Sequence, residues 1–274
     1  MQPYPRRARA PRGGILGSTA LRAYRRGRGR VAFCRETGYQ LAEPNPPKPP
    51  AMPQPTIAFD LDGTLVDTAP DLVGTLNAVL AREGYGTVAY AEARIMIGGG
   101  ARHMLARALS RQGVALDPPE LDRLFGDFIA HYGAHIADHS YPFPGLDQAL
   151  DVMAAQGARF AVCTNKLEQL SVRLLQRLGL AGRFAAICGQ DTFGMAKPDP
   201  ELLRQTIARA GGDLANAVMV GDSALDVATA RAASVPVIAV DFGYSDVPVP
   251  LLKADRAIGH FSELPGAVVA LLAR

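Results

Sequence analysis

An apolar run that ends in two closely spaced acids limits the possible fold and site of this chain more than any other stretch does. Residues 57–64 read IAFDLDGT. The apolar start predicts a buried β-strand, and acids at i and i+2 on an extended chain point to the same side. Neighbouring carboxylates raise each other's pKa unless positive charge compensates, so Asp60 and Asp62 predict a site where a cation or a reaction uses both. Gly63 permits a tight turn whose backbone N–H groups can surround an anion, and the Thr64 hydroxyl adds a donor.

The chain from residue 145 onward alternates apolar strands with helices. The predicted strands lie at 160–164, 185–188, 218–220 and 235–240, and helical segments lie at 200–210 and 223–233. Strands that are apolar on both faces and alternate with helices predict a parallel sheet covered on both sides. The expected fold class is therefore α/β, with a Rossmann-like, doubly wound core. Ligands bind beyond the carboxyl ends of strands in such sheets, and Thr164, Asn165, Lys197 and Asp222 follow predicted strands at those places.

Helical periodicity replaces the strand pattern directly after the first strand. Residues 70–140 predict a small all-helical cap domain inserted into a core made of 55–69 and 141–274. Gly98, Gly99 and Gly100 stand just ahead of one of its helices. They predict either a flexible loop or an anion site at the helix N-terminus, where Arg102 would supply positive charge.

Residues 1–51 differ in charge from the rest of the chain. They contain 11 basic and two acidic residues, a net charge of +9, and since the whole chain carries +3, residues 52–274 carry −6. The segment could bind nucleic acid or an anionic surface, or be a targeting peptide. It lacks interleaved aromatic residues and a periodic apolar face, which favours an unfolded, Pro-rich extension over residues 1–54. A true start at Met52 is one form of that hypothesis, and nucleic acid is then not an expected partner.

Cysteine content and hydrophobicity bear on the compartment. The cysteines, Cys34, Cys163 and Cys188, are few and scattered, so we expect a reducing, cytoplasmic environment rather than a disulfide framework. No apolar run reaches the roughly 18 residues of a membrane-spanning helix. We expect a monomer or homodimer that contacts no membrane.

Four motifs in order resemble those of the haloacid dehalogenase superfamily of aspartyl-phosphate phosphatases and phosphomutases. They are DLDGT after the first strand, CTN with Thr164, KPDP with Lys197, and GDSALD with Asp222 and Asp226. Their order and spacing agree over residues 55–245. The resemblance implies a hydrolase core of the predicted fold and a helical cap.

The resemblance also implies a role for each motif residue. Asp60 is the nucleophile, Asp62 is the general acid and base, and Lys197 offsets the charge of nucleophile and phosphate. Thr164, Asn165 and the turn at Gly63 and Thr64 bind phosphoryl oxygens. Four acids at one place predict Mg²⁺, held by the Asp60 carboxylate, the Asp62 backbone carbonyl and Asp222, while Asp226 binds Mg²⁺ or positions Lys197.

Sequences around the motifs are most similar to bacterial phosphoglycolate phosphatases. The segments IGGGARHMLARAL, YPFPGL and GQDTFGMAKPDP carry this likeness. It implies hydrolysis of 2-phosphoglycolate to glycolate and phosphate, with Gly99 and Arg102 of the cap at the substrate and Arg102 as a partner for its carboxylate. The alternatives are a β-phosphoglucomutase-like phosphotransferase and another small-phosphate or pyrophosphate hydrolase of the superfamily. A nucleic-acid-associated protein recruited through the basic segment is a further alternative from a different class.

Overall fold

The computed structural model describes residues 21–24, 32–35 and 54–273. Strands β1 (Leu21–Tyr24) and β2 (Ala32–Arg35) pair antiparallel, where the sequence pattern predicts no strand. They belong to a unit, Met1–Pro50, separate from the unit Ala51–Arg274. Other expectations for residues 1–53 lie outside the described residues. Across the described ranges, no helix combines the length and hydrophobicity that crossing a bilayer requires.

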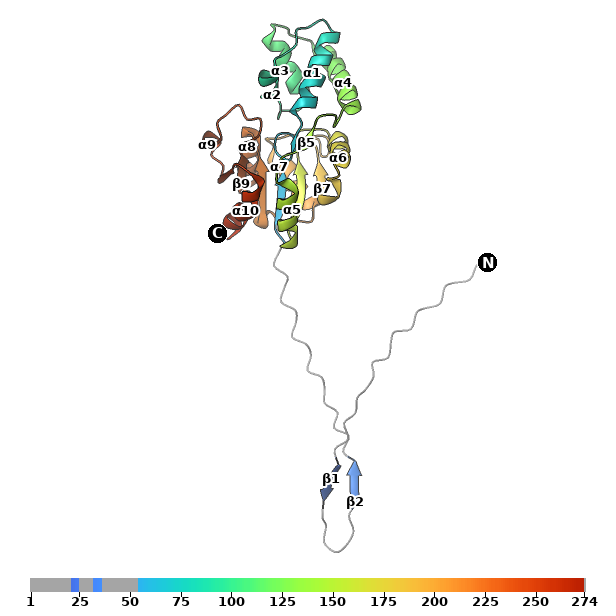
Figure 1. Cartoon of the computed structure of the whole chain (residues 1–274), viewed down its shortest axis with the longest axis vertical. Coiled ribbons are helices and arrows are strands. Elements are labelled where there is room, and N and C mark those ends of the chain that lie inside the picture. The colour runs from blue at the N-terminus through green and yellow to red at the C-terminus, as the bar shows by residue number, and fades with distance from the viewer. Residues whose placement is uncertain (1–20, 25–31, 36–53, 274) are drawn as a thin grey trace, which may run out of the picture. The chain divides into compact units, whose positions relative to one another are not determined.

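A six-stranded sheet forms the centre of the second unit (Figure 1). Its strands, in spatial order, are β10 (Arg256–Ile258), β9 (Val237–Val240), β8 (Ala217–Gly221), β3 (Thr56–Phe59), β6 (Arg159–Cys163) and β7 (Ala186–Cys188). Every neighbouring pair is parallel, which confirms the predicted α/β fold class. β6 and β7, which come next in this sheet along the chain, lie on one side of β3, and β8, β9 and β10 lie on the other side. The direction of winding therefore reverses beside β3, where a crevice forms in sheets of this kind.

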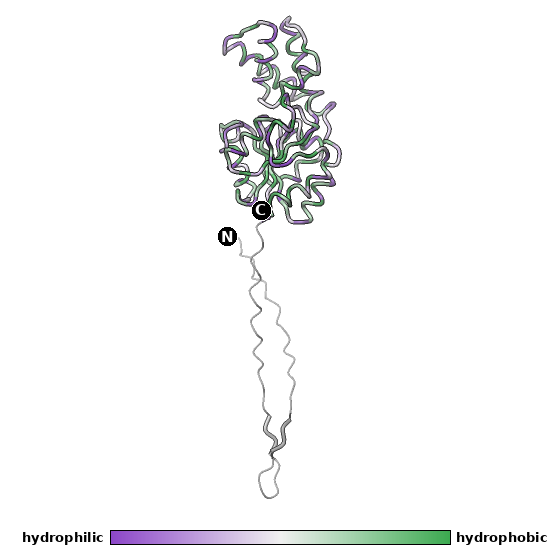
Figure 2. Tube along the Cα trace, turned by 90° about the vertical axis from the view of Figure 1, so that its left-hand side faces the viewer, coloured by the Kyte–Doolittle hydropathy of each residue, from purple (hydrophilic) through white to green (hydrophobic). Residues whose placement is uncertain are grey.

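Alternate side chains of each strand enter two separate hydrophobic clusters, one on each face of the sheet. Ile57 and Phe59 of β3 belong to one cluster, and Ala58 belongs to the other. The aromatic ring of Phe59 contacts Phe160 and Phe184, with centroids 6.2 and 6.4 Å apart. Figure 2 shows the hydropathy of each residue along the chain, with hydrophobic stretches in the interior of the second unit. Burial on both faces explains why the strands read as continuous apolar runs.

Helices cover both faces of the sheet. α7 (Pro200–Arg209) and α8 (Ala224–Ala233) pack on the face of Ala58. The other face is covered by α5 (Leu146–Ala155), α6 (Glu168–Arg177) and α10 (Leu264–Leu272). The remaining short helices are η1 (Ala181–Arg183), η2 (Leu214–Asn216), α9 (Val249–Leu252) and η3 (Phe261–Glu263).

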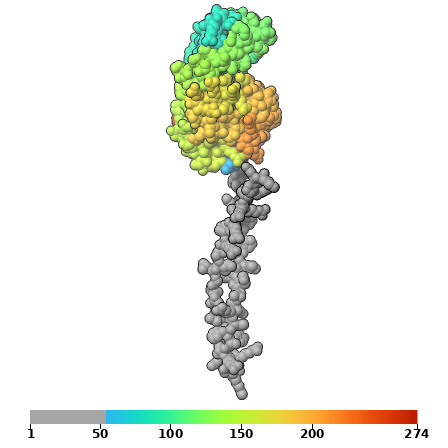
Figure 3. Space-filling model, turned by 90° about the vertical axis from the view of Figure 1, so that its right-hand side faces the viewer, coloured from blue at the N-terminus to red at the C-terminus, as the bar shows by residue number. Residues whose placement is uncertain are grey.

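A group of helices lies above the carboxyl edge of the sheet (Figures 1 and 3). It consists of α1 (Ala69–Arg82), α2 (Tyr90–Arg94), α3 (Ala101–Arg111) and α4 (Pro118–Ala134). The Asp117 side chain caps α4 by accepting a hydrogen bond from the Glu120 backbone N–H. Two short antiparallel strands, β4 (Val66–Asp67) and β5 (Tyr141–Pro142), connect the group to the core. The boundaries 70 and 140 stay a prediction.

Replacing Phe59 with Ala should lower the free energy of unfolding by about 3–5 kcal/mol, because the fully buried ring fills the space between β3 and its neighbours. Urea unfolding followed by circular dichroism measures this change. The control is Leu251→Ala, since Leu251 is 66% exposed and its truncation should change stability by less than about 0.5 kcal/mol. Equal effects of the two substitutions would contradict the central position of β3.

Candidate active site

Polar residues collect where three adjacent strands end. Asp60 and Asp62 follow β3, Thr164 follows β6, and Asp222 follows β8. The backbone N–H of Asp60 donates to the Val220 carbonyl at 2.9 Å, which continues the pairing of β3 with β8. The parallel sheet thus brings residues 60, 164 and 222 to one edge, as the sequence pattern predicts.

Three carboxylates and one ammonium form the buried centre of this edge. Carboxylate oxygens of Asp60, Asp222 and Asp226 lie within 4.8 Å of one another. The Lys197 Nζ lies 2.9 Å from Asp60 Oδ1 and 2.6 Å from Asp226 Oδ1. The Ser223 backbone N–H and hydroxyl donate to Asp226 Oδ2 at 3.0 and 2.6 Å. Both oxygens of Asp226 therefore have protein donors, and its position is fixed by the first turn of α8.

Burial and the excess of negative over positive charge both change the pKa values in this cluster, and burial has the larger effect on the two acids. Burial raises the pKa of Asp60 to about 6, against the lowering effect of Lys197. Burial, followed by the charges of Asp226 and Asp60, raises the pKa of Asp222 to about 8. Burial opposes the charge on Lys197, but the two carboxylates outweigh it and raise the pKa of that amine. A divalent cation with a preference for oxygen ligands, such as Mg²⁺, fits this donor set.

Asp222 is held from two sides by the turn after β3 and by a loop after β9. The Thr64 hydroxyl donates to Asp222 Oδ1 at 3.1 Å, and the Tyr244 backbone N–H donates to Oδ2 at 2.6 Å. Gly63 has φ of +84°, and a Cβ there would lie 2.6 Å from Asp222 Oδ2. Only glycine fits this position. The Thr64 hydroxyl, expected at a phosphate, is directed to Asp222 instead.

Asn165 connects three parts of the site. Its Oδ1 accepts a hydrogen bond from the Lys197 backbone N–H at 2.7 Å. Its Nδ2 donates to the carbonyls of Lys197 at 3.3 Å and Gly98 at 3.2 Å. The amide expected to bind phosphoryl oxygens thus holds the Lys197 backbone and the loop ahead of α3. Thr164 lies beside it, and its hydroxyl accepts from the Lys166 backbone N–H at 3.2 Å.

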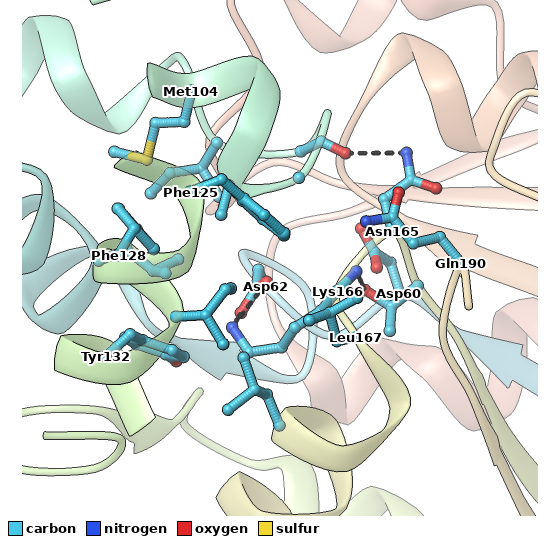
Figure 4. A pocket seen from close by; sticks show the side chains of 18 residues that line it. Asp60, Asp62, Met104, Phe125, Phe128, Tyr132, Asn165, Lys166, Leu167 and Gln190 are labelled. Carbon is cyan, nitrogen blue, oxygen red and sulfur yellow. Dashed lines mark hydrogen bonds and ion pairs between the residues drawn. The ribbon is translucent and has the colours of Figure 1, made fainter. Parts of the chain in front are cut away.

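A cavity lies between the helices α1–α4 and the carboxyl edge of the sheet (Figure 4). Its polar wall comes from the core and its apolar wall mainly from the helices: the lining includes Asp60, Asp62, Thr164, Asn165, Lys166, Gln190, Met104, Phe125, Phe128 and Ile129. Gly98 and Gly100 also line it, whereas Gly99 and Arg102 do not. Arg102 is 43% exposed and forms an ion pair with Asp122. The structure therefore does not bring the predicted carboxylate partner to this cavity.

Lys166 is a site residue that the sequence analysis did not single out. Its Nζ lies 2.9 and 3.1 Å from the two carboxylate oxygens of Asp62, and the Thr68 hydroxyl donates to Asp62 Oδ1 at 2.8 Å. The lysine is only 8% exposed. Lys166 directly follows Thr164 and Asn165 at the end of a predicted strand, and this position could have identified it as a site residue from the sequence. Asp62 thus enters the site as an ion pair rather than as part of the carboxylate cluster.

Comparison with known proteins identifies the family. The family model for haloacid dehalogenase-like hydrolases matches residues 57–240. Phosphoglycolate phosphatases of Caulobacter vibrioides and Mesorhizobium japonicum are 46% and 48% identical to this chain over 217 and 213 residues. These matches span 79% and 78% of this chain and 92% and 94% of the relatives.

Solved structures agree with this family match. A structure described as a predicted phosphoglycolate phosphatase from Haemophilus somnus is similar with a TM-score of 0.73 and 26% identity. The match covers 80% of this chain and 99% of that chain. The fold, the order of the four motifs and these relatives agree, which confirms the resemblance found in the sequence. The chain belongs to the haloacid dehalogenase-like hydrolase family and is a phosphatase.

Proposed function

We propose that this phosphatase hydrolyses 2-phosphoglycolate to glycolate and phosphate, depends on Mg²⁺, and acts through an aspartyl-phosphate. The observation that carries the chemistry is the buried cluster of Asp60, Asp222 and Asp226 around Lys197. The names of the relatives at 46–48% identity support the substrate. The small, partly apolar cavity over Asp60 and Asp62 suits a short phosphate ester.

Asp60 is the nucleophile in this proposal. The Leu61 backbone N–H at 2.7 Å and the Lys197 ammonium at 2.9 Å both bind Oδ1, which leaves Oδ2 to attack phosphorus. A bond forms between Oδ2 and phosphorus while the bond from phosphorus to the ester oxygen breaks. Lys197 offsets the negative charge that gathers on the nucleophile and the phosphoryl group.

Asp62 transfers the protons. In its protonated form it gives its proton to the ester oxygen as glycolate leaves and becomes the carboxylate that Lys166 binds. It then regains a proton from the water that attacks phosphorus of the aspartyl-phosphate. The second attack breaks the bond between Asp60 and phosphorus and releases phosphate. The Thr164 hydroxyl is the proposed donor to a phosphoryl oxygen, because the backbone N–H groups of Gly63 and Thr64 already donate to the carbonyls of Val66 and Leu61 at 3.0 and 3.4 Å.

The carboxylates of Asp60 and Asp222 and the backbone carbonyl of Asp62 would hold Mg²⁺. Asp226 would hold Lys197 in place, because its two oxygens already have protein donors. Bound Mg²⁺ supplies positive charge that stabilises a phosphoryl group under attack.

The helices α1–α4 are the proposed cap. They cover the carboxyl edge of the sheet and contribute Met104, Phe125 and Phe128 to the cavity. An apolar cover excludes water from the reacting groups and strengthens electrostatic interactions among them. Exclusion of bulk water restricts the attacking water to the one that Asp62 can activate.

The full chain with Mg²⁺ should release phosphate from 2-phosphoglycolate with a kcat/KM at least about tenfold above that for other small phosphate esters, because its carboxylate adds a second charged contact. Phosphate release across a panel of esters measures this preference. Equal rates across the panel would reject the substrate while leaving the phosphatase chemistry intact. Transfer of phosphate to a sugar phosphate without release would favour the phosphotransferase alternative.

Replacing Asp60 with Asn should lower kcat by at least about 1,000-fold, because an amide cannot form the phosphorylated intermediate. Wild-type protein quenched in acid after reaction with ³²P-labelled substrate should retain label that hydroxylamine removes, and Asp60→Asn should retain none. The matched control is Asp213→Asn, since Asp213 is exposed and caps η2 away from the cavity. Retention of label by Asp60→Asn would place the nucleophile elsewhere.

Mg²⁺ should stabilise the protein more at pH 8 than at pH 6. The folded pKa values of about 6 for Asp60 and about 8 for Asp222 exceed the unfolded value of about 3.9. The free energy of unfolding of the metal-free protein therefore falls as pH rises from about 4 to 8, and Mg²⁺ offsets this loss by binding the ionised carboxylates. Proton competition should weaken the apparent affinity up to about 100-fold at pH 6.

Thermal unfolding at increasing Mg²⁺ concentration measures that affinity at each pH. Asp222→Asn is the comparison variant, and it should reduce both the Mg²⁺ effect and its dependence on pH. Equal rises in Tm at the two pH values in the wild-type protein would contradict the proposed ligand set.

A further inference from the structure

A buried cation and a buried hydroxyl in the cavity have no role in the reaction described above. Lys166 is the only cation among the described residues that line the cavity, and its side chain is 6% exposed. Its Nζ contacts Asp62 and lies 4.3 Å from the centroid of the Tyr132 ring on α4. Figure 4 shows Lys166, Asp62 and Tyr132 side by side on the cavity wall. A core residue and a helix of the cap therefore meet at this ammonium.

The Tyr132 hydroxyl is an unpaired donor. The residue is 1% exposed, and its hydroxyl has no acceptor for its proton among the described residues, since its polar neighbour Lys166 is an ammonium that can only donate. Burial raises the pKa of Tyr132 to about 12, so the group keeps its proton at neutral pH. Buried polar groups nearly always have a partner, and one that lines a cavity can obtain it from a ligand.

The place of Lys166 in the site determines which part of the substrate it can reach. Lys197 is buried against Asp60 and so lies at the phosphoryl group. Lys166 contacts Asp62, the group that protonates the leaving oxygen. In 2-phosphoglycolate a single carbon separates that oxygen from the carboxylate. A cation in contact with Asp62 is therefore close to the second anionic group of the substrate.

We propose that the Lys166 ammonium and the Tyr132 hydroxyl form a subsite that binds the substrate carboxylate and selects phosphate esters of short hydroxy acids. The inference rests on the proposed function. An ammonium has three N–H donors, so Lys166 can bind a second carboxylate while it holds Asp62. Apolar neighbours in the lining, Leu72, Phe128 and Leu170, exclude water and strengthen these charge-assisted hydrogen bonds. Arg102, paired with Asp122 outside the cavity, does not serve this role.

The test compares 2-phosphoglycolate with ethyl phosphate, which carries a methyl group in place of the carboxylate. Lys166→Met should lower the ratio of the two kcat/KM values by about 10–100-fold, mainly through a higher KM for 2-phosphoglycolate. Tyr132→Phe keeps the ring and removes only the unpaired hydroxyl, and it should lower the ratio by about 3–10-fold. The control, Arg173→Met, removes an exposed cation of α6 outside the cavity lining and should leave the ratio unchanged.

Two outcomes would overturn the subsite. Equal losses on both substrates in Lys166→Met and Tyr132→Phe would mean that Lys166 only positions Asp62. A ratio that collapses in Arg102→Met but not in Lys166→Met would place the carboxylate at Arg102. Unchanged thermal unfolding of each variant establishes that a loss reflects the site rather than the fold.

A binding measurement separates this inference from the proposed function. Calorimetry with Mg²⁺ would compare 3-phosphonopropionate, which has a methylene in place of the ester oxygen, with propylphosphonate, which lacks the carboxylate. Weaker binding of the first compound alone in Lys166→Met supports the subsite even if 2-phosphoglycolate is not hydrolysed. Hydrolysis of 2-phosphoglycolate together with binding that does not depend on Lys166 overturns the subsite and leaves the proposed function standing.

Discussion

Repulsion among three buried carboxylates at one edge of the sheet is the constraint on which the rest of the structure depends. Asp60 follows β3, whereas Asp222 and Asp226 lie between β8 and the first turn of α8. Among the described side chains, Lys197 alone forms direct ion pairs in this cluster, with Asp60 and Asp226. Buried charges are tolerated only where partners and hydrogen bonds compensate their desolvation. The central position of β3 between β6 and β8 meets this demand, because it lets donors from several loops converge on the acids.

The two acids that follow β3 have different partners, and this difference divides the site. Asp60 contacts Lys197, whose side chain has no exposed surface, whereas Asp62 contacts Lys166 on the wall of the cavity. In the proposed reaction the first pair acts at phosphorus and the second at the leaving group. The two acids of one short motif, only two residues apart, therefore lie in different chemical environments.

One loop connects the acid cluster to the helices above it. The Tyr244 backbone N–H holds Asp222, while its hydroxyl donates to Asp67 Oδ1 at 2.6 Å and accepts from the Ala69 backbone N–H at 2.9 Å. The Arg94 guanidinium of α2 lies 4.7 Å from the centroid of the Tyr244 ring and donates to the carbonyl of Gly243 at 2.8 Å. The same loop therefore contacts both the helices and a proposed metal ligand.

The sequence by itself determined the fold class, the family and the residues of the carboxyl edge. Apolar strands that alternate with helices can form only a covered parallel sheet, and such a sheet gathers at one edge the residues that follow its strands. Such strands and helices can be predicted from the sequence because each pattern depends on only a few neighbouring residues. The short edge strand β10, by contrast, has no such pattern and was not predicted.

Only the tertiary structure decided the partner of each polar group. Thr64 binds Asp222, Asn165 binds the Lys197 backbone, and Arg102 pairs with Asp122 outside the cavity. The pairing of Lys166 with Asp62 and Tyr132 joins residues far apart in the chain. Hydrogen bonds and ion pairs act over about 3 Å, and distances of that kind between distant residues follow from packing, which a linear pattern does not encode.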